Sequence, residues 1–277
     1  MKALKTPLRY PGGKSRAVPK LAKHMPDLSK FDIYREPFLG GGSVALHVTK
    51  TYPKLKIWVN DLYEPLVNFW QQLQHEGNYL YTELTKAKNF HPDPDSAKNL
   101  FAESKEKIND KSVSEKDRAV AFYIVNKCSF SGLTESSSFS KQASISNFSL
   151  RGIEKLPGYS SIISNWHINN YSYEYLMTQQ MHDHIFMYLD PPYDIKDNLY
   201  GRKGSMHKGF DHDQFARDCD KHSHIDMMVS YNSDQLVKDR FTNWKATEFD
   251  LTYTMRSVGE YMREQKGRKE LILMNYG

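Results

Sequence analysis

The chain has 277 residues, which suits one large domain or one domain that carries an inserted lobe. Its 38 basic and 33 acidic residues leave a net charge of +5, a mildly basic balance that permits a nucleic-acid partner without indicating one. The two cysteines lack disulfide or metal spacing, no apolar run reaches the length of a membrane span, and the N-terminus lacks the apolar core of a signal peptide. We therefore expect a cytoplasmic protein with no membrane partner.

A glycine-rich turn near the N-terminus is the first candidate ligand contact. Residues 8–14 are Leu-Arg-Tyr-Pro-Gly-Gly-Lys, and a helical pattern with Val18, Leu21 and Met25 on one face follows. The glycines allow the backbone to approach a ligand closely, and the Lys14 ammonium can reach an anionic group. A tight turn before a surface helix would explain the same residues. The spacing does not match a phosphate-binding loop, which excludes a nucleoside triphosphatase.

The next segment predicts a strand, a glycine loop and a helix, the opening unit of a dinucleotide-type α/β sheet. The strand starts at Ile33, the loop contains glycines 40–42, and a second strand, Ile57–Asn60, ends at Asp61. An acidic residue at that place suits a pair of ribose hydroxyls, while the G-x-G-x-x-G phosphate fingerprint is missing. An adenosine ligand without phosphates fits both observations, and S-adenosylmethionine (AdoMet) is the obvious candidate. Asp61 would also serve as a helix N-cap, with Glu64 completing a capping box, and the two roles are compatible.

A helical stretch follows this unit. Apolar residues recur at three- and four-residue spacing over 66–84, and two further helices are expected at about 97–108 and 115–127. Cys128–Arg151 differs, because nine serines are interleaved with aromatic and basic residues. Such a polar, adaptable loop suits contacts with phosphates and base edges. A solvated loop with its aromatic rings turned inward would have the same composition.

The sheet is expected to resume with a strand at Ile162–Ile168. Because strand ends line the ligand pocket in this kind of fold, Asn170 and Tyr171 are candidates for contact with an adenine ring. A simple strand-to-helix connection is the alternative. Near the C-terminus, Thr252–Met255 and Leu271–Tyr276 predict a terminal antiparallel pair of strands.

The apolar run Ile185–Leu189 predicts a buried strand that stops at two prolines. Pro191 and Pro192 fix the backbone and push Asp190 into an extended conformation, which makes a stiff corner at the carboxyl end of a strand, where open α/β sheets bind ligands. The corner presents the Asp190 carboxylate and a backbone carbonyl, which are both acceptors, and the ring of Tyr193. Together these groups suit an amine that donates two hydrogens while its planar ring stacks on tyrosine. An ordinary strand-ending turn would contain the same residues.

Histidine pairs at 182/184 and 222/224 have the alternate spacing of metal ligands but no third partner, so we expect no metal site.

Four motifs occur in a fixed order: Arg9–Lys14, Glu36–Ser43, Asn60-Asp61 and Asp190–Tyr193. Taken together they resemble the motif set of the Dam-type (alpha-group) DNA adenine-N6 methyltransferases, in which the glycine loop precedes an insertion and Asp-Pro-Pro-Tyr follows it. The resemblance extends to the closing segment 269–273. It implies an α/β fold, a Rossmann-like AdoMet-dependent methyltransferase sheet with an inserted, mainly helical target-recognition lobe.

In such a fold the catalytic domain would combine residues 1–63 and 160–277, and the DNA-binding lobe would span 64–159. The resemblance implies cofactor roles for Tyr10, Lys14, Phe38, Asp61 and Asp190. It also makes Arg9 a candidate for a target-base contact, since arginine grips guanine with two hydrogen bonds in the major groove.

With the candidates from the loops and strand ends, the expected cofactor site comprises Tyr10, Lys14, Pro37, Phe38, Gly40, Asp61, Asn170, Tyr171 and Asp190. The expected catalytic residues are Asp190, Pro191, Pro192 and Tyr193. The expected DNA contacts are Arg9, Asn126, Lys127, Ser129, Lys141 and Arg151.

The implied reaction transfers the AdoMet methyl group to N6 of an adenine flipped out of a short sequence of double-stranded DNA, with S-adenosylhomocysteine (AdoHcy) as the product. The Asp190 carboxylate and the Pro191 carbonyl would each accept one N6 hydrogen, and Tyr193 would stack on the base. Residues 126–134 depart from the basic run of relatives that recognise GATC, which puts GATC in doubt as the target.

Several alternatives stay open. A monomer or weak dimer is expected in a bacterial or phage-infected cell, and partnership with a cognate restriction endonuclease, replication control and phage protection are all compatible roles. A methyltransferase acting on an RNA base or another planar amine is the closest alternative function, although such relatives more often have asparagine in place of Asp190. A nuclease would not explain two glycine loops, and a catalytically inactive DNA-binding relative would not need an intact Asp-Pro-Pro-Tyr corner.

Overall fold

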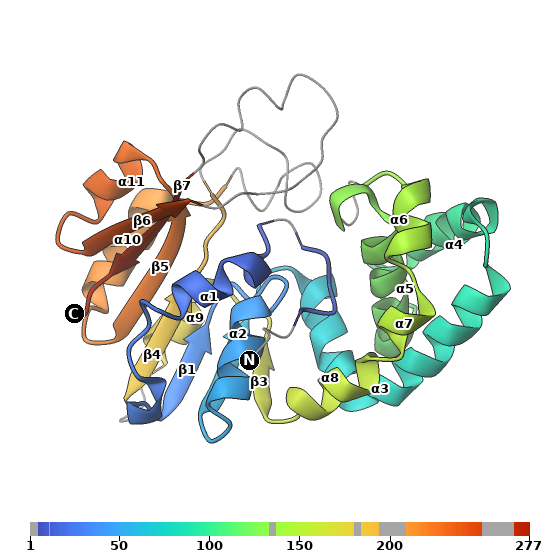
Figure 1. The fold of residues 1–277 in the computed structure, drawn as a ribbon, viewed down its shortest axis with the longest axis horizontal. Coiled ribbons are helices and arrows are strands. Elements are labelled where there is room, and N and C mark those ends of the chain that lie inside the picture. Colours follow the sequence, from blue (N-terminus) through green and yellow to red (C-terminus); the bar gives the residue numbers. More distant parts are fainter. Residues whose placement is uncertain (1–4, 11, 133–136, 180–183, 194–208, 251–268) are drawn as a thin grey trace.

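The computed structural model describes residues 5–10, 12–132, 137–179, 184–193, 209–250 and 269–277. A seven-stranded sheet forms its centre, in the order β3-β2-β1-β4-β5-β7-β6 (Figure 1). The strands are β1 (Ile33–Glu36), β2 (Lys56–Asn60), β3 (Trp166–Asn169), β4 (Ile185–Leu189), β5 (Asp226–Asn232), β6 (Lys245–Asp250) and β7 (Lys269–Met274). The pairs from β3 to β5 are parallel, whereas β7 is antiparallel to both β5 and β6. This confirms the expected Rossmann-like α/β sheet.

Helices cover both faces of the sheet. On one face lie α1 (Val18–Leu21), α2 (Ser43–Thr51) and the start of α3 (Glu64–Phe90), and on the other lie α9 (Tyr173–Thr178), α10 (His212–Lys221) and α11 (Gln235–Arg240). A parallel strand covered on both sides must be apolar throughout, and β4 is buried at every position. Its side chains alternate between the two faces of the sheet. Phe186 and Tyr188 join the hydrophobic core on the α2 face, and Met187 and Leu189 join the core on the α10 face.

A group of helices extends from one end of the sheet (Figure 1). It contains the far half of α3 with α4 (Pro94–Lys107), α5 (Glu115–Cys128), α6 (Lys141–Ser146) and α7 (Leu150–Ile153), and α8 (Leu156–Ile162) leads back to β3. Three short 3-10 turns, η1 (Lys14–Arg16), η2 (Leu28–Lys30) and η3 (Phe130–Gly132), complete the described elements.

Helix α3 runs from the sheet into this group and bends on the way. Its backbone leaves helical geometry at Glu76, and the next residue, Gly77, packs against α8 so closely that a Cβ there would lie 2.6 Å from Ser160 Cβ. The Ser160 hydroxyl donates a hydrogen bond of 3.0 Å to the Gln74 carbonyl beside the bend. A donor from another helix inserted next to the helical ladder is one of the recognised causes of such a bend.

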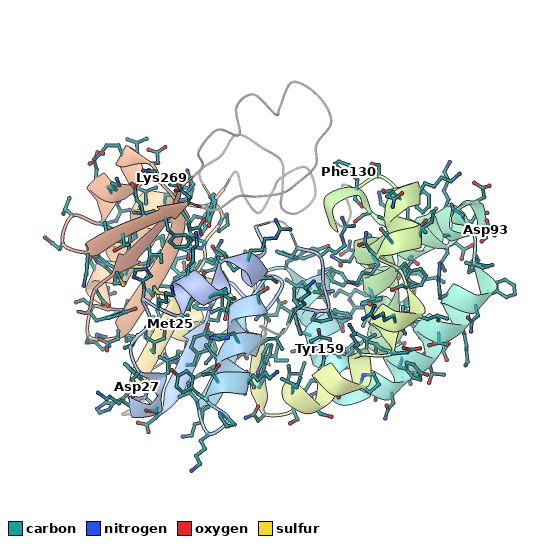
Figure 2. All side chains as sticks on the ribbon, viewed as in Figure 1. Met25, Asp27, Asp93, Phe130, Tyr159 and Lys269 are labelled. Atoms are coloured by element: carbon teal, nitrogen blue, oxygen red, sulfur yellow. The ribbon has the colours of Figure 1, made fainter. Side chains whose placement is uncertain are left out.

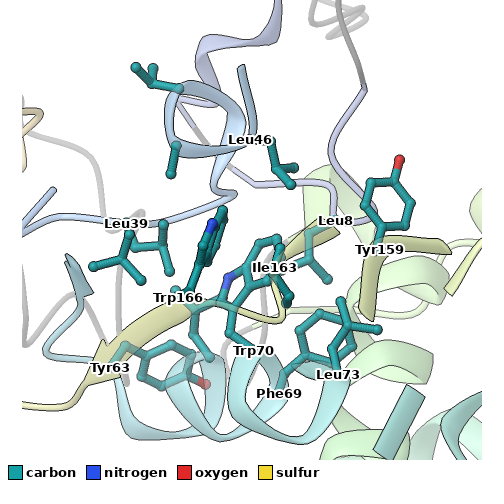
Figure 3. Close-up of a cluster of buried hydrophobic side chains, with 14 of the residues drawn as sticks. Leu8, Leu39, Leu46, Tyr63, Phe69, Trp70, Leu73, Tyr159, Ile163 and Trp166 are labelled. Carbon is teal, nitrogen blue, oxygen red and sulfur yellow. The ribbon is translucent and has the colours of Figure 1, made fainter. Parts of the chain in front are cut away.

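Two tryptophans join α3 to the sheet (Figure 3). The Trp70 ring of α3 lies 5.6 Å from the ring of Trp166, the first residue of β3. The Trp166 indole N–H donates to Thr49 Oγ1 at 2.7 Å, and the Trp70 indole N–H donates to the Gly40 carbonyl at 3.2 Å. Both rings are buried with their polar groups satisfied, so this junction fixes the glycine loop against the first turns of α3.

Most expected elements are confirmed, including the strand before Asp190 and the two helices near 97–108 and 115–127. The strand predicted at Ile162–Ile168 is wrong at its start, because Ile162 ends α8 and the strand begins at Trp166. Ile163 is apolar because it packs among the helices, which a short apolar run cannot distinguish from a strand.

Two further expectations need correction. The predicted capping box between Asp61 and Glu64 is wrong, because Tyr63 is the N-cap of α3 and Glu64 instead pairs with Arg118 at 2.9 Å. The terminal antiparallel pair exists, but the partner of β7 is Lys245–Asp250, and residues 252–255 lie outside the described ranges. Within those ranges no helix is long and apolar enough to cross a membrane.

The glycine loop gives a stability prediction. Gly42 has φ +66, and a Cβ there would lie 2.8 Å from the Trp70 ring. We expect Gly42→Ala to lower the free energy of unfolding by at least about 1–2 kcal/mol, the cost of left-handed backbone in an L-residue, with the ring contact adding to it. Gly158→Ala, in α8 with nothing within 4 Å of the added Cβ, is the matched control and should stabilise by about 0.4–1 kcal/mol. Urea denaturation measures both, and equal effects of the two substitutions would contradict the packing described here.

Candidate active site

A cavity of about 330 Å³ opens at the carboxyl edge of the sheet. It lies where β1 and β4 meet, the point at which the strand order reverses and where open α/β sheets bind their ligands. Its volume is within the range of small-molecule sites. The lining comes from segments that are distant in sequence, namely Tyr10 and Gly12–Lys14, Glu36–Val44, Asn60–Leu62, Ser172–Glu174, Tyr188, Asp190–Tyr193, Gly209–Asp211 and Gln214.

One side of the cavity is the glycine loop after β1. Gly40 adopts φ +48, and a Cβ at this position would lie 3.1 Å from the Tyr10 ring, so only glycine fits without displacement. The Gly40 N–H donates to Asp61 Oδ2 at 2.9 Å, and the Tyr63 N–H donates to Asp61 Oδ1 at 3.0 Å. Burial raises the pKa of the Asp61 carboxyl to about 6. A carboxylate has about four acceptor positions, so these two bonds leave Asp61 able to accept from ligand hydroxyls.

The floor of the cavity carries a buried lysine between acidic groups. The Lys14 ammonium lies 2.7 Å from Asp190 Oδ1 and 3.3 Å from Glu270 Oε1. It donates a hydrogen bond of 2.6 Å to the Tyr193 hydroxyl, which in turn donates to Glu270 Oε1 at 2.5 Å. Lys14 is 4% exposed and Glu270 is 1% exposed, so these two side chains are shielded from water, whereas Asp190 and Tyr193 are partly exposed to the cavity. The predicted residues Lys14, Asp190 and Tyr193 are therefore brought together, and Glu270 joins them.

Burial also sets the ionisation of the Asp190 corner. It raises the pKa of the Asp190 carboxyl to about 6, an effect that Lys14 opposes and Glu270 reinforces. Behind it, Glu36 on β1 accepts a hydrogen bond of 2.5 Å from the Tyr34 hydroxyl. Burial, together with the charge of Asp190, raises the pKa of Glu36 well above its usual range. Burial thus favours the neutral form of Glu36, and Asp61 and Asp190 are two further carboxyl groups that line the cavity.

A cluster of aromatic side chains forms another part of the cavity wall. The sequence predicted only one of its members as a site residue. The predicted Phe38 stacks on Tyr173 with 5.5 Å between ring centroids, and Phe210 meets it edge-on at 5.9 Å. Phe215 of α10 supports all three rings from behind. An apolar wall of aromatic rings beside the Asp61 carboxylate suits a purine ring. Aromatic residues just after a predicted strand and at the start of a predicted helix were the available signal.

The predicted ring contacts of Asn170 and Tyr171 are not supported, because neither residue lines the cavity. The Asn170 amide donates to the carbonyls of Asp61, at 2.9 Å, and Leu62, at 3.1 Å. Tyr171 is half exposed and packs on Tyr175 at 4.3 Å. Asn170 thus supports the Asp61 turn from outside, and residues 172–174, where α9 begins, line the cavity whereas Tyr171 does not.

Two predicted DNA contacts lie in the interior. Asn126 and Ser129 are fully buried, and the Asn126 side chain binds the backbone of Arg9 through both its amide oxygen and its amide nitrogen. The Arg9 guanidinium donates to the Ser129 carbonyl at 2.9 Å. Their burial argues against the predicted contact with DNA. Asn126 and Ser129 instead hold Arg9 in place beside the cavity.

The remaining predicted DNA contacts differ in exposure. Lys127 is 9% exposed, with its ammonium 5.2 Å from the centre of the Tyr123 ring, and burial lowers its pKa to about 8. Lys141 and Arg151 are exposed at the starts of α6 and α7. Phe130, labelled in Figure 2, is the first residue of η3, just after α5, and is 55% exposed. No cluster of three metal-ligating side chains occurs in the ranges that the structure describes.

Known proteins match this chain over most of its length. The model of the D12 class N6 adenine-specific DNA methyltransferase family matches residues 10–255. The Type II methyltransferase M1.LlaDCHI of Lactococcus lactis subsp. cremoris is 23% identical, over 97% of this chain and 94% of the relative. The Type II methyltransferase M.MjaIII of Methanocaldococcus jannaschii is 22% identical, over 97% and 98%.

Two further comparisons give either a shorter match or a weaker structural likeness. The DNA N-6-adenine-methyltransferase of Escherichia phage P1 is 29% identical over 46% of this chain, which is 15% of that protein. Among solved structures, the rRNA methyltransferase aviRa from Streptomyces viridochromogenes is 9% identical with a TM-score of 0.37, over 94% of this chain and 84% of that one, a likeness that supports no inference about function. The family match spans nearly the whole chain, and the chain therefore belongs to the D12 class of N6 adenine-specific DNA methyltransferases, enzymes that methylate adenine N6 in DNA.

Proposed function

We propose that the enzyme takes the methyl group from AdoMet and transfers it to an adenine extruded from a short site in double-stranded DNA, with Asp190–Tyr193 as the catalytic corner. The observation that carries the proposal is the position of this corner. Its carboxylate and prolines line the same cavity as the glycine loop and Asp61. Cofactor and target amine would therefore meet in one enclosed space.

The residues of the cavity fit AdoMet. The Asp61 carboxylate would accept from the ribose hydroxyls, and the wall of Phe38, Tyr173 and Phe210 would hold the adenine ring of the cofactor. Tyr10, Pro37 and Gly40 would close over it from the two glycine turns. When bound, AdoMet supplies a methyl group that the positive charge on sulfur has already activated.

The corner would act by aligning a poor nucleophile. The N6 lone pair of adenine is delocalised into the ring, and the amine is inaccessible within the duplex, so the base must leave the stack at a cost of a few kcal/mol. Asp190 and the Pro191 carbonyl would each accept one N6 hydrogen and turn the lone pair toward the methyl group. Alignment of this kind contributes up to about 7–11 kcal/mol in favourable systems.

The first test is methyl transfer from labelled AdoMet to unmethylated duplex DNA, followed by nucleoside analysis. The wild-type enzyme should produce N6-methyladenine. Asp190→Ala should lower turnover by about 10²–10³-fold, the range seen when one preorganised electrostatic contact is removed, while circular dichroism and DNA binding stay unchanged. Near-normal turnover in this variant would contradict the assignment.

Substitutions of Tyr193 separate the contribution of its ring from that of its hydroxyl. The ring would stack on the target adenine, whereas the hydroxyl contacts Lys14 and Glu270. Tyr193→Ala should lose most activity together with the stacking surface. Tyr193→Phe keeps the ring but removes the hydroxyl that joins Lys14 and Glu270, so its turnover should lie between those of the wild type and Tyr193→Ala. Single-turnover rates measure both. Equal rates in the two variants would assign the whole effect to the hydroxyl.

The pKa of Asp190 predicts the acid side of the pH profile. Burial raises this pKa to about 6, and the ionised carboxylate accepts the N6 hydrogen more strongly than the protonated acid does. The single-turnover rate should therefore be independent of pH just above about 6 and fall about tenfold for each pH unit below it. A rate that stays constant down to the ordinary pKa of a carboxyl group would show that Asp190 ionisation does not limit the step.

We further propose that the lobe of residues 64–159 binds the DNA backbone and that Arg9 reaches a base beside the cavity. Lys141 and Arg151 are exposed on this lobe, and Arg9 is held by Asn126 at its junction with the cavity. Two relatives of this chain are named Type II methyltransferases. The biological role that we propose to test first is therefore partnership with a cognate restriction endonuclease.

Salt dependence tests the interface. Each lysine or arginine that contacts a phosphate releases counterions on binding, so Lys141→Ala and Arg151→Ala should each reduce the slope of log affinity against log salt by about 1. Lys54→Ala is the control, because Lys54 is exposed in the turn at the opposite, amino edge of the sheet. Fluorescence anisotropy with duplex DNA measures the slopes. Equal slopes for all three variants would place the DNA elsewhere.

A further inference from the structure

Glu270 contacts the catalytic residues without lining the cavity. It is the second residue of β7 and is 1% exposed, and its Oε1 atom accepts from the Tyr193 hydroxyl at 2.5 Å and lies 3.3 Å from the Lys14 ammonium. The cavity wall includes Lys14, Asp190 and Tyr193 but not Glu270. Glu270 thus stands directly behind the groups that would touch the ligands.

The direction of β7 explains how Glu270 arrives there. Because β7 is antiparallel to β5, its first residues lie beside the last residues of β5, and Glu270 pairs with Asn232. This places the beginning of β7 at the carboxyl edge of the sheet, where the cavity opens. Side chains alternate along β7, so Glu270 shares a face with Ile272, which packs in the same core as Tyr188. Glu270 and Asp190 therefore approach Lys14 from the same side of the sheet.

We propose that Glu270 is a positioning residue for methyl transfer: it anchors the Tyr193 hydroxyl and shares the Lys14 ammonium with Asp190, so that the ring and the carboxylate keep the orientation that the target adenine requires. This inference rests on the proposed function of the Asp190 corner. A second carboxylate beside Lys14 has an electrostatic consequence. Glu270 draws part of the Lys14 ammonium's attraction away from Asp190, and an Asp190 more tightly paired with Lys14 would be a weaker acceptor for the N6 hydrogens.

The pKa of Asp190 reports this balance, because the influences of Lys14 and Glu270 have opposite signs. Lys14 lowers the pKa of Asp190 and Glu270 raises it. Other titratable groups also act on the site from β1 and β4. Among the residues that the structure describes, the titratable groups that interact with Asp190 include Lys14, Tyr34, Glu36, Tyr188, Tyr193 and Glu270. Substituting Lys14 or Glu270 changes one influence and leaves the others in place.

Three variants separate the charge of Glu270 from its hydrogen bond. Glu270→Gln keeps an acceptor for the Tyr193 hydroxyl but removes the charge, Glu270→Ala removes both, and Lys14→Met removes the opposing cation. Glu248→Gln is the matched control. Glu248 lies on the neighbouring strand β6, where it binds Lys238 at 2.5 Å and Ser233 at 2.6 Å, away from Lys14 and Tyr193.

Single-turnover methyl transfer to unmethylated duplex DNA, measured across pH in the full chain, gives the first readout. Glu270→Ala should lower the maximal rate by on the order of 10²-fold, as misplacement of a catalytic group does. Glu270→Gln should recover most of that loss and shift the acid limb to lower pH, whereas Lys14→Met should shift it to higher pH. AdoMet affinity should stay at the wild-type value in both Glu270 variants, and Glu248→Gln should match the wild type throughout.

A second readout needs no substrate. Titration of the ¹³C-labelled aspartate carboxyls by NMR in the free enzyme, with the Asp190 signal assigned by Asp190→Asn, should give a lower pKa in Glu270→Gln and a higher one in Lys14→Met. If the wild type forms no N6-methyladenine, the proposed function fails, and this titration still decides whether Glu270 acts on Asp190. An unshifted Asp190 pKa in Glu270→Gln, a wild-type rate in Glu270→Ala, or a loss confined to AdoMet affinity would each overturn the proposal.

Discussion

The contact between the buried Lys14 ammonium and the Asp190 carboxylate, 2.7 Å apart, is the interaction on which the rest of the site depends. Burying two charges is costly, and a buried pair offsets that cost only when further hydrogen bonds satisfy its atoms. Here Tyr193 and Glu270 provide them. The pair consequently ties the N-terminal turn to the end of β4 and the start of β7. The same burial that makes the arrangement costly raises the pKa of Asp190 and makes it a strong acceptor.

The topology of the sheet makes this convergence possible. The carboxyl ends of parallel strands meet at one edge, and the reversal of strand order between β1 and β4 opens a crevice there. The loops after β1, β2 and β4 enter that crevice as a direct result of strand direction. The antiparallel strand β7 contributes Glu270 from near its beginning rather than from its end. Helix α3 then links this edge to the helical lobe through Trp70, which touches both the glycine loop and β3.

Sequence reasoning succeeded where a local pattern had one physical meaning. The apolar run before Asp190 predicted a strand buried on both faces because two prolines follow it, and prolines end such a strand. It failed where a role depended on distant contacts. Glu270 occurs in a charged segment with no local sign of burial, and its partners are far away in sequence. Asn126 resembles a surface amide, yet its amide is used to hold the backbone of Arg9. Tyr173 lines the cavity rather than Tyr171 because α9 starts at Tyr173, a boundary that composition does not fix to the residue.

The central claim is that the Asp190 corner holds the target amine for transfer. The most direct measurement is a structure of the enzyme with AdoHcy and a DNA duplex that contains its methylation site. The account predicts an adenine outside the duplex, stacked on Tyr193, with N6 at a hydrogen-bond distance of about 3 Å from both the Asp190 carboxylate and the Pro191 carbonyl. An adenine whose N6 points away from these two oxygens, or a methylated position found on another base, would contradict it.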